Sequence, residues 1–334
     1  PTATPTPTPD PTTAPTPIPT ATPVPPTPTP APASGSTWGF SGGGSPFALA
    51  VDVAQNIWVT NDGNTMTVTK NDLNGTRLGS KVVGTNAHDL AVQSSNQRVW
   101  VTVNGDGLVT VFDPTLTQVM RLAPGINPEG IAFDANENAW VCDASGGRLL
   151  ELDSQDGHTI ATHSFHNVNA KPRHILFDGQ GNAWVSLNGA NQVVRIAPDG
   201  SELRVDTDAH PSRLALDDNG NVWVTCTGTD IDLLSTGEVP GHTVMRINPT
   251  CTNAIPFQVG NSPYGISKDP AGNILVVNSG SNSMMRLDAN TGAALQTYGN
   301  LGSPASHPFN VAMNNAGFAW LTLFSDNILL KMWP

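Results

Sequence analysis

The sequence predicts an all-β fold: a seven-bladed β-propeller at residues 37–334, preceded by a Pro/Thr-rich segment at residues 1–36. Three observations predict it. A unit with a period of about 40–50 residues recurs seven times. Each copy has the pattern of short strands and tight turns. An extra strand precedes the first copy, and the last copy lacks one.

The seven copies share an apolar strand, a turn rich in Asp, Asn and Gly, and a second strand that carries Trp. They span residues 48–62, 89–104, 128–143, 172–188, 211–226, 263–278 and 308–323. The Trp positions are Trp58, Trp100, Trp140, Trp184, Trp223 and Trp320, and Leu275 takes this place in the sixth copy. Repeats of this length with strand-like content indicate propeller blades.

Each copy predicts a four-stranded antiparallel meander. In the fourth copy, the turn at 178–182 holds residues that tolerate positive φ, and the second strand begins with Ala183 and Trp184. A third strand at 193–196 shows alternation, and the turn at 198–200 leads to the fourth strand. Small residues in the first strand suit a crowded position near a central channel. The Trp can fill the gap between neighbouring blades.

Ring closure follows from the strand count. After Trp320 the last copy has one more strand, at 328–332, so its fourth strand is missing. We predict that a segment at about 36–40 pairs with that strand and completes the blade. Closure of the ring removes exposed sheet edges that promote aggregation.

The Gly-Ile-Ala…Asp…Gly-Asn…Trp-Val unit resembles the repeats of NHL-type and streptogramin-lyase-like propellers over residues 37–334. The shared residues are structural, so the resemblance implies the fold more than a function. Lyases of that family use a His and a Glu near the channel mouth, with a divalent metal. His88, His174 and Glu129 lie in that zone. The family's Glu after Trp-x-Thr is replaced, and the matching positions hold Asn61, Asp143 and Asn278.

Polar residues at the starts of the first strands converge on the channel mouth, where ligands of propellers usually bind. The candidates for binding a glycan or a peptide are His88, Glu129, Arg173, His174, Arg213 and Tyr264. Asp89 and Asn310 occupy similar positions. Asn and Asp at the ends of the second strands are explained more simply by turn hydrogen bonds. No catalytic set, metal-ligand set or cofactor motif is evident, so we expect covalent glycans as the only non-protein groups.

The three cysteines are Cys142, Cys226 and Cys251. Cys226 ends the second strand of the fifth copy, and Cys251 lies at the turn into its fourth strand. A disulfide between them would staple the base of an insertion at 227–242. The alternative is that both are unpaired small core residues. We expect Cys142 to be buried and inert.

Residues 1–36 predict an extended stalk. Proline fixes φ and removes the backbone donor, so polyproline II is expected, with a reach of roughly 100 Å at about 3.1 Å per residue. Thr-rich sequence with Pro is typical of O-glycosylated stalks, although a bare spacer is the alternative. The candidate threonines are Thr2, Thr4, Thr6, Thr8, Thr12, Thr13, Thr16, Thr20, Thr22, Thr27 and Thr29. The sequon at Asn74 is a weaker N-glycosylation candidate.

Composition indicates a secreted or cell-surface protein. Charged residues are 13% of the chain and the net charge is −12, so no basic stripe is present to bind nucleic acid. No apolar run approaches the roughly 18–20 residues that span a bilayer. We expect a signal peptide to have been removed before Pro1.

Three functions follow, in order of preference. The first is an extracellular structural subunit of a glycosylated surface fibre or filament, which self-associates head to tail through the stalk. The second is a stalk-displayed propeller that binds a glycan or peptide at the channel mouth. The third is a metal-dependent enzyme of the lyase or lactonase type.

Overall fold

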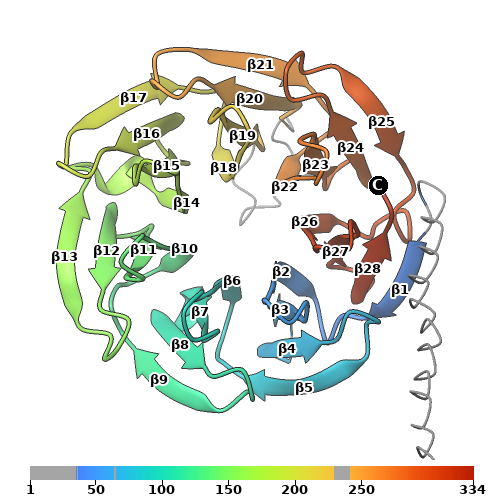
Figure 1. The fold of residues 1–334 in the computed structure, drawn as a ribbon, viewed down its shortest axis with the longest axis horizontal. Coiled ribbons are helices and arrows are strands. Elements are labelled where there is room, and N and C mark those ends of the chain that lie inside the picture. Colours follow the sequence, from blue (N-terminus) through green and yellow to red (C-terminus); the bar gives the residue numbers. More distant parts are fainter. Residues whose placement is uncertain (1–34, 36, 64, 229–240) are drawn as a thin grey trace, which may run out of the picture. The chain divides into compact units, whose positions relative to one another are not determined.

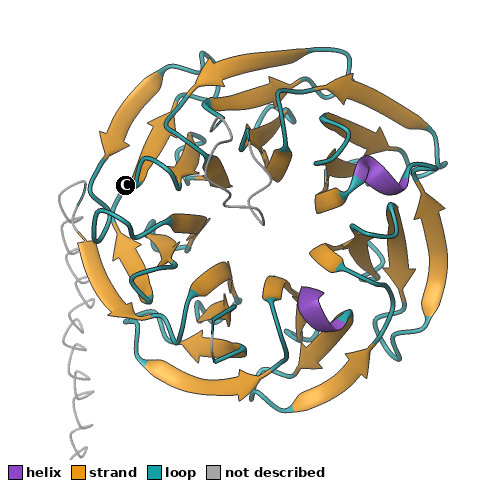
Figure 2. Ribbon diagram, turned by 180° about the vertical axis from the view of Figure 1, so that it is seen from behind, coloured by secondary structure: helices purple, strands orange, loops and turns teal. Residues whose placement is uncertain are grey.

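The chain folds as a ring of seven four-stranded antiparallel sheets around a central channel (Figure 1). The computed structural model describes residues 35, 37–63, 65–228 and 241–334. Within these residues, the helical structure is two short 3₁₀ turns, η1 (Asn104–Asp106) and η2 (Val168–Ala170), drawn in purple in Figure 2. The predicted seven-bladed propeller is confirmed.

The first four blades follow the chain, and in each the innermost strand comes first. Blade 1 holds β2 (Pro46–Val51), β3 (Ile57–Asn61), β4 (Thr67–Asn71) and β5 (Arg77–Val82). Blade 2 holds β6 (Ala87–Val92), β7 (Val99–Val103), β8 (Leu108–Phe112) and β9 (Gln118–Leu122). Blade 3 holds β10 (Pro128–Phe133), β11 (Ala139–Asp143), β12 (Arg148–Leu152) and β13 (Thr159–Ser164). Blade 4 holds β14 (Pro172–Phe177), β15 (Ala183–Leu187), β16 (Gln192–Ile196) and β17 (Glu202–Asp206).

The remaining blades repeat this order, except that the last one borrows a strand. Blade 5 holds β18 (Pro211–Leu216), β19 (Val222–Cys226), β20 (Thr243–Ile247) and β21 (Ala254–Gln258). Blade 6 holds β22 (Pro263–Lys268), β23 (Ile274–Asn278), β24 (Ser283–Leu287) and β25 (Ala294–Tyr298). Blade 7 holds β26 (Pro308–Met313), β27 (Ala319–Leu323), β28 (Ile328–Met332) and β1 (Thr37–Ser41).

The ring closes as the sequence predicts, one residue later than expected. Strand β1 pairs antiparallel with β28, with Thr37 opposite Met332 and Ser41 opposite Ile328. Next to this pair, the Gly35 amide donates to the Trp333 carbonyl at 2.7 Å. A second closure lies nearer the channel, where the Thr322 hydroxyl of β27 donates to the Phe47 carbonyl of β2 at 2.7 Å. Blades 7 and 1 are therefore joined at the inner strands as well.

Tryptophans fill the gaps between blades. Trp58, from blade 1, is fully buried in a cluster with Val99 and Val101 of blade 2. At the ring closure, Trp320 of blade 7 packs with Ile57 and Val59 of blade 1. The predicted inter-blade role of the Trp is confirmed at these positions, and the burial of large aromatic surface is a main stabilising term of the ring.

In four of the blades the Trp also forms a hydrogen bond to the turn of its own blade. The Trp184 indole N–H donates to the Asp178 carboxylate at 2.9 Å, and Asp178 accepts the Asn182 amide as well. The same Asp–Trp bond recurs in blades 1, 3 and 5. In blade 6, where Leu275 replaces Trp, the Arg286 side chain donates to the turn carboxylate of Asp269 at 2.7 Å. A positive donor thus takes the place of the indole.

The predicted Cys226–Cys251 disulfide is wrong, because all three cysteines are free and buried. Cys226 pairs with Thr243 at one end of the sheet, whereas Cys251 follows Ile247 in the turn at the opposite end. The strand between them separates the two residues by roughly 13 Å, and a disulfide needs Cα atoms within about 7 Å. Burial raises the pKa of the Cys226 thiol to about 12 and that of Cys251 to about 11.

Several predictions concern residues outside the described part of the chain. The stalk threonines all lie before residue 35, and most of the insertion, residues 229–240, is also outside. Asn74 is described and lies exposed in the turn between β4 and β5. Its glycosylation stays a prediction. No helix among the described residues is long and apolar enough to cross a membrane.

Candidate functional site

The starts of the innermost strands aim side chains at the centre of the ring. In all seven blades, the pairing between the first and second strands shifts register near the first residue of the innermost strand. Such a bulge redirects the residues beside it. The second and third residues of each innermost strand therefore line the centre, which is the zone predicted from the sequence.

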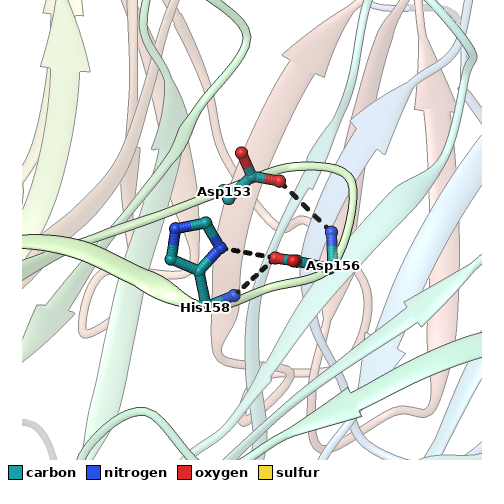
Figure 3. Close-up of side chains that lie close together, drawn as sticks. All are labelled: Asp153, Asp156 and His158. Atoms are coloured by element: carbon teal, nitrogen blue, oxygen red, sulfur yellow. Dashed lines mark hydrogen bonds and ion pairs between the residues drawn. The ribbon is translucent and has the colours of Figure 1, made fainter.

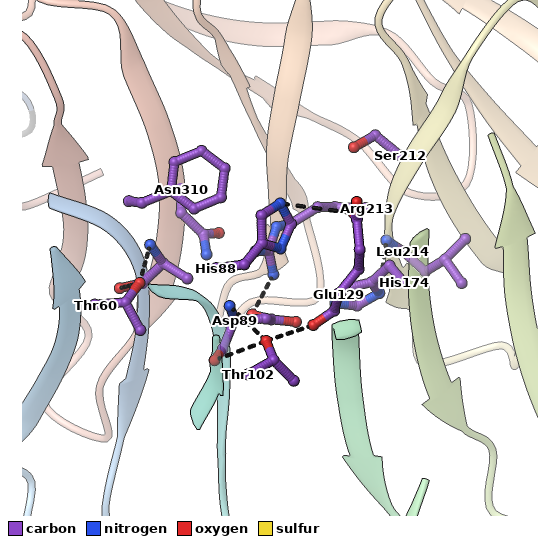
Figure 4. Close-up of polar contacts among 12 residues, drawn as sticks. Thr60, His88, Asp89, Thr102, Glu129, His174, Ser212, Arg213, Leu214 and Asn310 are labelled. Atoms are coloured by element: carbon purple, nitrogen blue, oxygen red, sulfur yellow. Dashed lines mark hydrogen bonds and ion pairs between the residues drawn. The ribbon is translucent and has the colours of Figure 1, made fainter. Parts of the chain in front are cut away.

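The predicted binding residues do come together there, but they are buried. His88, Glu129, Arg173, Arg213 and Tyr264 each keep 7% or less of their surface exposed. His174 is partly buried. Figure 4 shows His88, Glu129, His174 and Arg213 facing one another from different blades. Their role in binding a ligand stays a prediction.

One ion pair crosses the centre of the ring. The Arg213 Nη1 atom of β18 lies 2.9 Å from the Asp89 Oδ1 atom of β6, so it joins blades 5 and 2. Burial opposes the charge of Asp89, but Arg213, His174 and His88 together outweigh it. The pKa of the Asp89 carboxyl therefore lies below its ordinary value.

A second group lies around Glu129 on blade 3. Its Oε2 atom is 3.6 Å from His88 Nε2 and 3.5 Å from Arg173 Nη1. Two guanidinium groups thus face two carboxylates, Asp89 and Glu129, within one buried network. Paired charges of this kind are far less costly to bury than isolated ones.

His174 is held in its neutral form. Its Nδ1 atom accepts the Leu214 amide at 3.4 Å. Desolvation, with the nearby Arg213 charge, lowers the pKa of His174 to about 4, against the opposing effect of Asp89. Near neutral pH the ring is therefore uncharged and positioned by a backbone donor.

The other half of the centre is aromatic. Phe47, Tyr264, Phe309 and Phe324 form one cluster, in which the Phe47 and Phe309 rings lie 5.0 Å apart. The Arg213 guanidinium lies 5.7 Å from the Tyr264 ring, where a cation–π contact links the two halves. The sequence analysis did not identify these phenylalanines. The available signal was their repeat position, since Phe47 and Phe309 stand where Arg173 stands in blade 4.

The described side chains at the centre are therefore largely buried and in contact with one another. Two buried polar atoms, Ser212 Oγ and Arg213 Nε, have no hydrogen-bond partner among the described residues. Such atoms are commonly satisfied by ordered water. The arrangement can hold water and small polar groups beside Arg213, and its main chemical effect is to brace the blades.

At the ends of the second strands, Asp143 and Asn278 bind loop backbone as predicted, whereas Asn104 donates to the Glu129 carboxylate at 3.2 Å. The Asp143 carboxylate accepts the amides of Ile126 and Asn127, and the Arg148 side chain donates to it at 2.9 Å. Asn278 Oδ1 accepts the Gly260 amide at 3.1 Å. These contacts satisfy backbone donors where blades connect.

Asp153, Asp156 and His158 also bring possible metal-ligand atoms together, in the turn after β12 (Figure 3). Here the Asp153 carboxylate accepts the Asp156 amide, and His158 Nδ1 lies 2.6 Å from Asp156 Oδ1. These hydrogen bonds explain the cluster as a capped, largely exposed turn.

Together, these observations define a seven-bladed β-propeller, and its fold resembles that of solved streptogramin lyases. A streptogramin B lyase is similar in structure with a TM-score of 0.76 and 18% identity, over 89% of this chain and 96% of that one. Virginiamycin B lyase from Staphylococcus aureus matches with a TM-score of 0.76 and 16% identity, over 90% and 99%.

Other functions occur on similar structures. A Kuenenia stuttgartiensis hydrazine synthase chain matches with a TM-score of 0.73 and 15% identity, over 87% of this chain and 96% of that one. No family model and no curated protein sequence matches this chain. At these identities the likeness shows the fold alone.

Proposed function

We propose that the protein is an extracellular structural subunit, in which rigid propellers are linked through their Pro/Thr segments into a glycosylated fibre or filament. The observation that carries this proposal is the set of buried side chains that contact one another at the centre of the ring. Asp89 and Arg213 pair across it, and the Phe47 cluster packs beside them. A propeller braced in this way suits a building block.

A lyase is less well supported by the same residues. General acid–base catalysis works best when the pKa of the catalytic group is near the working pH. His174 has its pKa lowered to about 4, and its Nδ1 atom is occupied by the Leu214 amide. The position of the family's Glu after the second strand holds Asp143 in blade 3, and this carboxylate is used by backbone amides.

The binding-module alternative requires accessible side chains at the mouth. Glu129 is 3% exposed and Arg173 is 5% exposed, and both contact one another. A glycan would have to displace those contacts before it could use them. The structural role needs no such rearrangement.

Imaging of the native assembly, combined with intact-mass measurement, tests the proposal. We expect filaments with a ring-shaped repeat, and a mass excess in sugar-sized steps that maps to residues 1–34. A protein that stays monomeric at all concentrations, with unmodified threonines, would contradict the proposal. Turnover of a substrate that EDTA abolishes would favour the enzyme instead.

A further inference from the structure

A groove lies between blades 6 and 7, on the face that carries the turns between first and second strands, with an apolar part and a more polar part. A hollow of about 170 Å³ is lined by Pro270, Ala271, Gly317, Trp333 and Pro334, with Asp269 and Arg286 beside them. A shallower hollow of about 420 Å³ adjoins it at Pro270, reaches Met313 and has the polar residues Lys268, Asn314 and Asn315 in its lining. We call the two together the proline groove.

Aromatic rings extend the proline groove toward the rim of blade 7. The Trp333 ring lies edge-to-face with Phe318 at 5.1 Å, and Phe318 meets Trp38 in the same way at 5.8 Å. Trp38 keeps 41% of its surface exposed. Pro270 and Ala271 are exposed as well. Trp333 stands against Gly317, where a Cβ would lie 3.0 Å from the indole, so this ring position depends on glycine.

The groove offers hydrogen-bond donors as well as rings. No described residue accepts a hydrogen bond from the Trp333 indole N–H. The Arg286 guanidinium uses its Nε to bind Asp269. A partner that suits this surface would bring apolar rings and backbone carbonyls, and few donors of its own.

Residues 1–34 of this sequence have that chemistry. Proline recurs at almost every second position, and each proline lacks an amide donor while keeping its carbonyl. Asp10 is the single charged side chain in the segment. Pro-rich segments dock in aromatic-lined grooves because polyproline II is preformed and loses little entropy on binding.

The place where this segment joins the propeller also supports the segment as the occupant of the groove. The Gly35 amide donates to the carbonyl of Trp333, a residue of the groove itself. Each propeller therefore carries both a Pro/Thr segment and a proline groove at the closing blade. A segment and a groove on different copies make a heterologous contact, which repeats from copy to copy.

We infer that the proline groove binds the Pro/Thr segment of a second copy of this chain, and that this contact joins successive propellers. The inference rests on the proposed structural function and names its contact. Single grooves of this size bind weakly, so assembly depends on protein concentration.

Complementation between two variants tests the contact. Ala271→Glu places a charge in the groove and keeps the segment. Deletion of residues 1–34 removes the segment and keeps the propeller, whose ring closes from Thr37 onward. We expect each variant alone to sediment as a monomer, with an apparent Kd at least about tenfold above that of the full chain. We expect an equimolar mixture to form a 1:1 pair that does not grow.

A matched control is Gln180→Glu, at the same turn position in blade 4, which should assemble like the unaltered chain with the same thermal midpoint. Assembly of Ala271→Glu at the unaltered affinity would overturn the groove and leave the fibre proposal standing. Assembly of the deletion variant alone would overturn the segment as occupant. If the unaltered chain stays monomeric at all concentrations, the inference and the proposed function both fail. The same holds if it stays monomeric because its segment binds the groove of its own copy.

Discussion

The contact between Asp89 and Arg213 is a buried ion pair that spans the ring from blade 2 to blade 5. Removing one partner leaves the other charge buried and unpaired, which typically costs about 3–5 kcal/mol. We therefore expect Arg213→Met to lower the free energy of unfolding by roughly that amount. The double variant Asp89→Asn/Arg213→Met should recover most of the loss.

Urea denaturation of the four proteins in this cycle gives the coupling energy. Equal losses in the single and double variants would mean that Asp89 keeps another strong partner when Arg213 is removed. In that case His174, which also acts on the Asp89 charge, would be the first residue to examine.

His174 makes stability depend on pH. Its pKa is lowered to about 4 in the folded protein, from an ordinary value near 6.5. Between these two pH values the unfolded chain binds more protons than the folded protein. The contribution of neutral His174 to the free energy of unfolding is therefore full above about pH 6.5 and is lost as the pH falls toward 4. The effect is at most ~3 kcal/mol, and smaller because the ring keeps some contact with solvent.

The variant His174→Gln keeps an acceptor for the Leu214 amide but does not titrate. We expect its free energy of unfolding to fall less than that of the unaltered protein between pH 6.5 and pH 4. Parallel curves for the two proteins would show that His174 is protonated normally in the fold.

Among the structural elements, the second strand of every blade except blade 6 carries a Trp, and the hydrogen bonding of its indole N–H differs from blade to blade. Trp184 donates to the Asp178 carboxylate, whereas Trp100 is equally buried and its indole N–H has no partner among the described residues. A comparison of these two residues therefore separates the contribution of the hydrogen bond to stability from that of the buried surface area.

Replacing each Trp by Phe should therefore cost more stability at position 184 than at position 100. The difference should be about 1.5–3 kcal/mol, because the lost bond goes to a charged group. Chemical denaturation of both variants measures it. Equal costs would show that packing between blades, and not the Asp–Trp bond, accounts for the stability.

The repeat pattern explains why the strands could be predicted from the sequence. Each blade repeats the same local signals, so seven copies support one interpretation of strand and turn. The Asp–Trp bond needed the structure, because a residue six positions away comes into reach only through the turn. The disulfide prediction failed because two cysteines in the same blade were assumed to lie close together. Cys226 and Cys251 lie at opposite ends of the sheet.

The repeat pattern also explains why the residues at the centre could be predicted in part. The repeat places His88, Glu129 and Arg213 at one end of the channel, and the structure confirms that placement. The pairing across the ring, from Arg213 to Asp89, depends on the ring's closure and has no signature in a single blade. The aromatic half was missed because Phe47 and Phe309 look like ordinary strand residues.

At the scale of the whole molecule, the closing strand β1 decides whether the ring is complete. It covers the hydrogen-bonding edge of β28, from Ile328 to Met332. An uncovered edge strand is a template for pairing with other chains. The stability of the ring and its resistance to aggregation therefore both depend on residues far from β28 in the sequence.

Deletion of residues 1–41 should expose that edge, whereas deletion of residues 1–34 should not. We expect the longer deletion to lower the thermal midpoint by several degrees, about what a loss of 1–2 kcal/mol gives for a chain of this size, and to aggregate on heating. Scanning calorimetry with light scattering compares the two. A longer deletion that remains as stable and as soluble as the shorter one would mean that the inner bond from Thr322 to Phe47 is sufficient to close the ring.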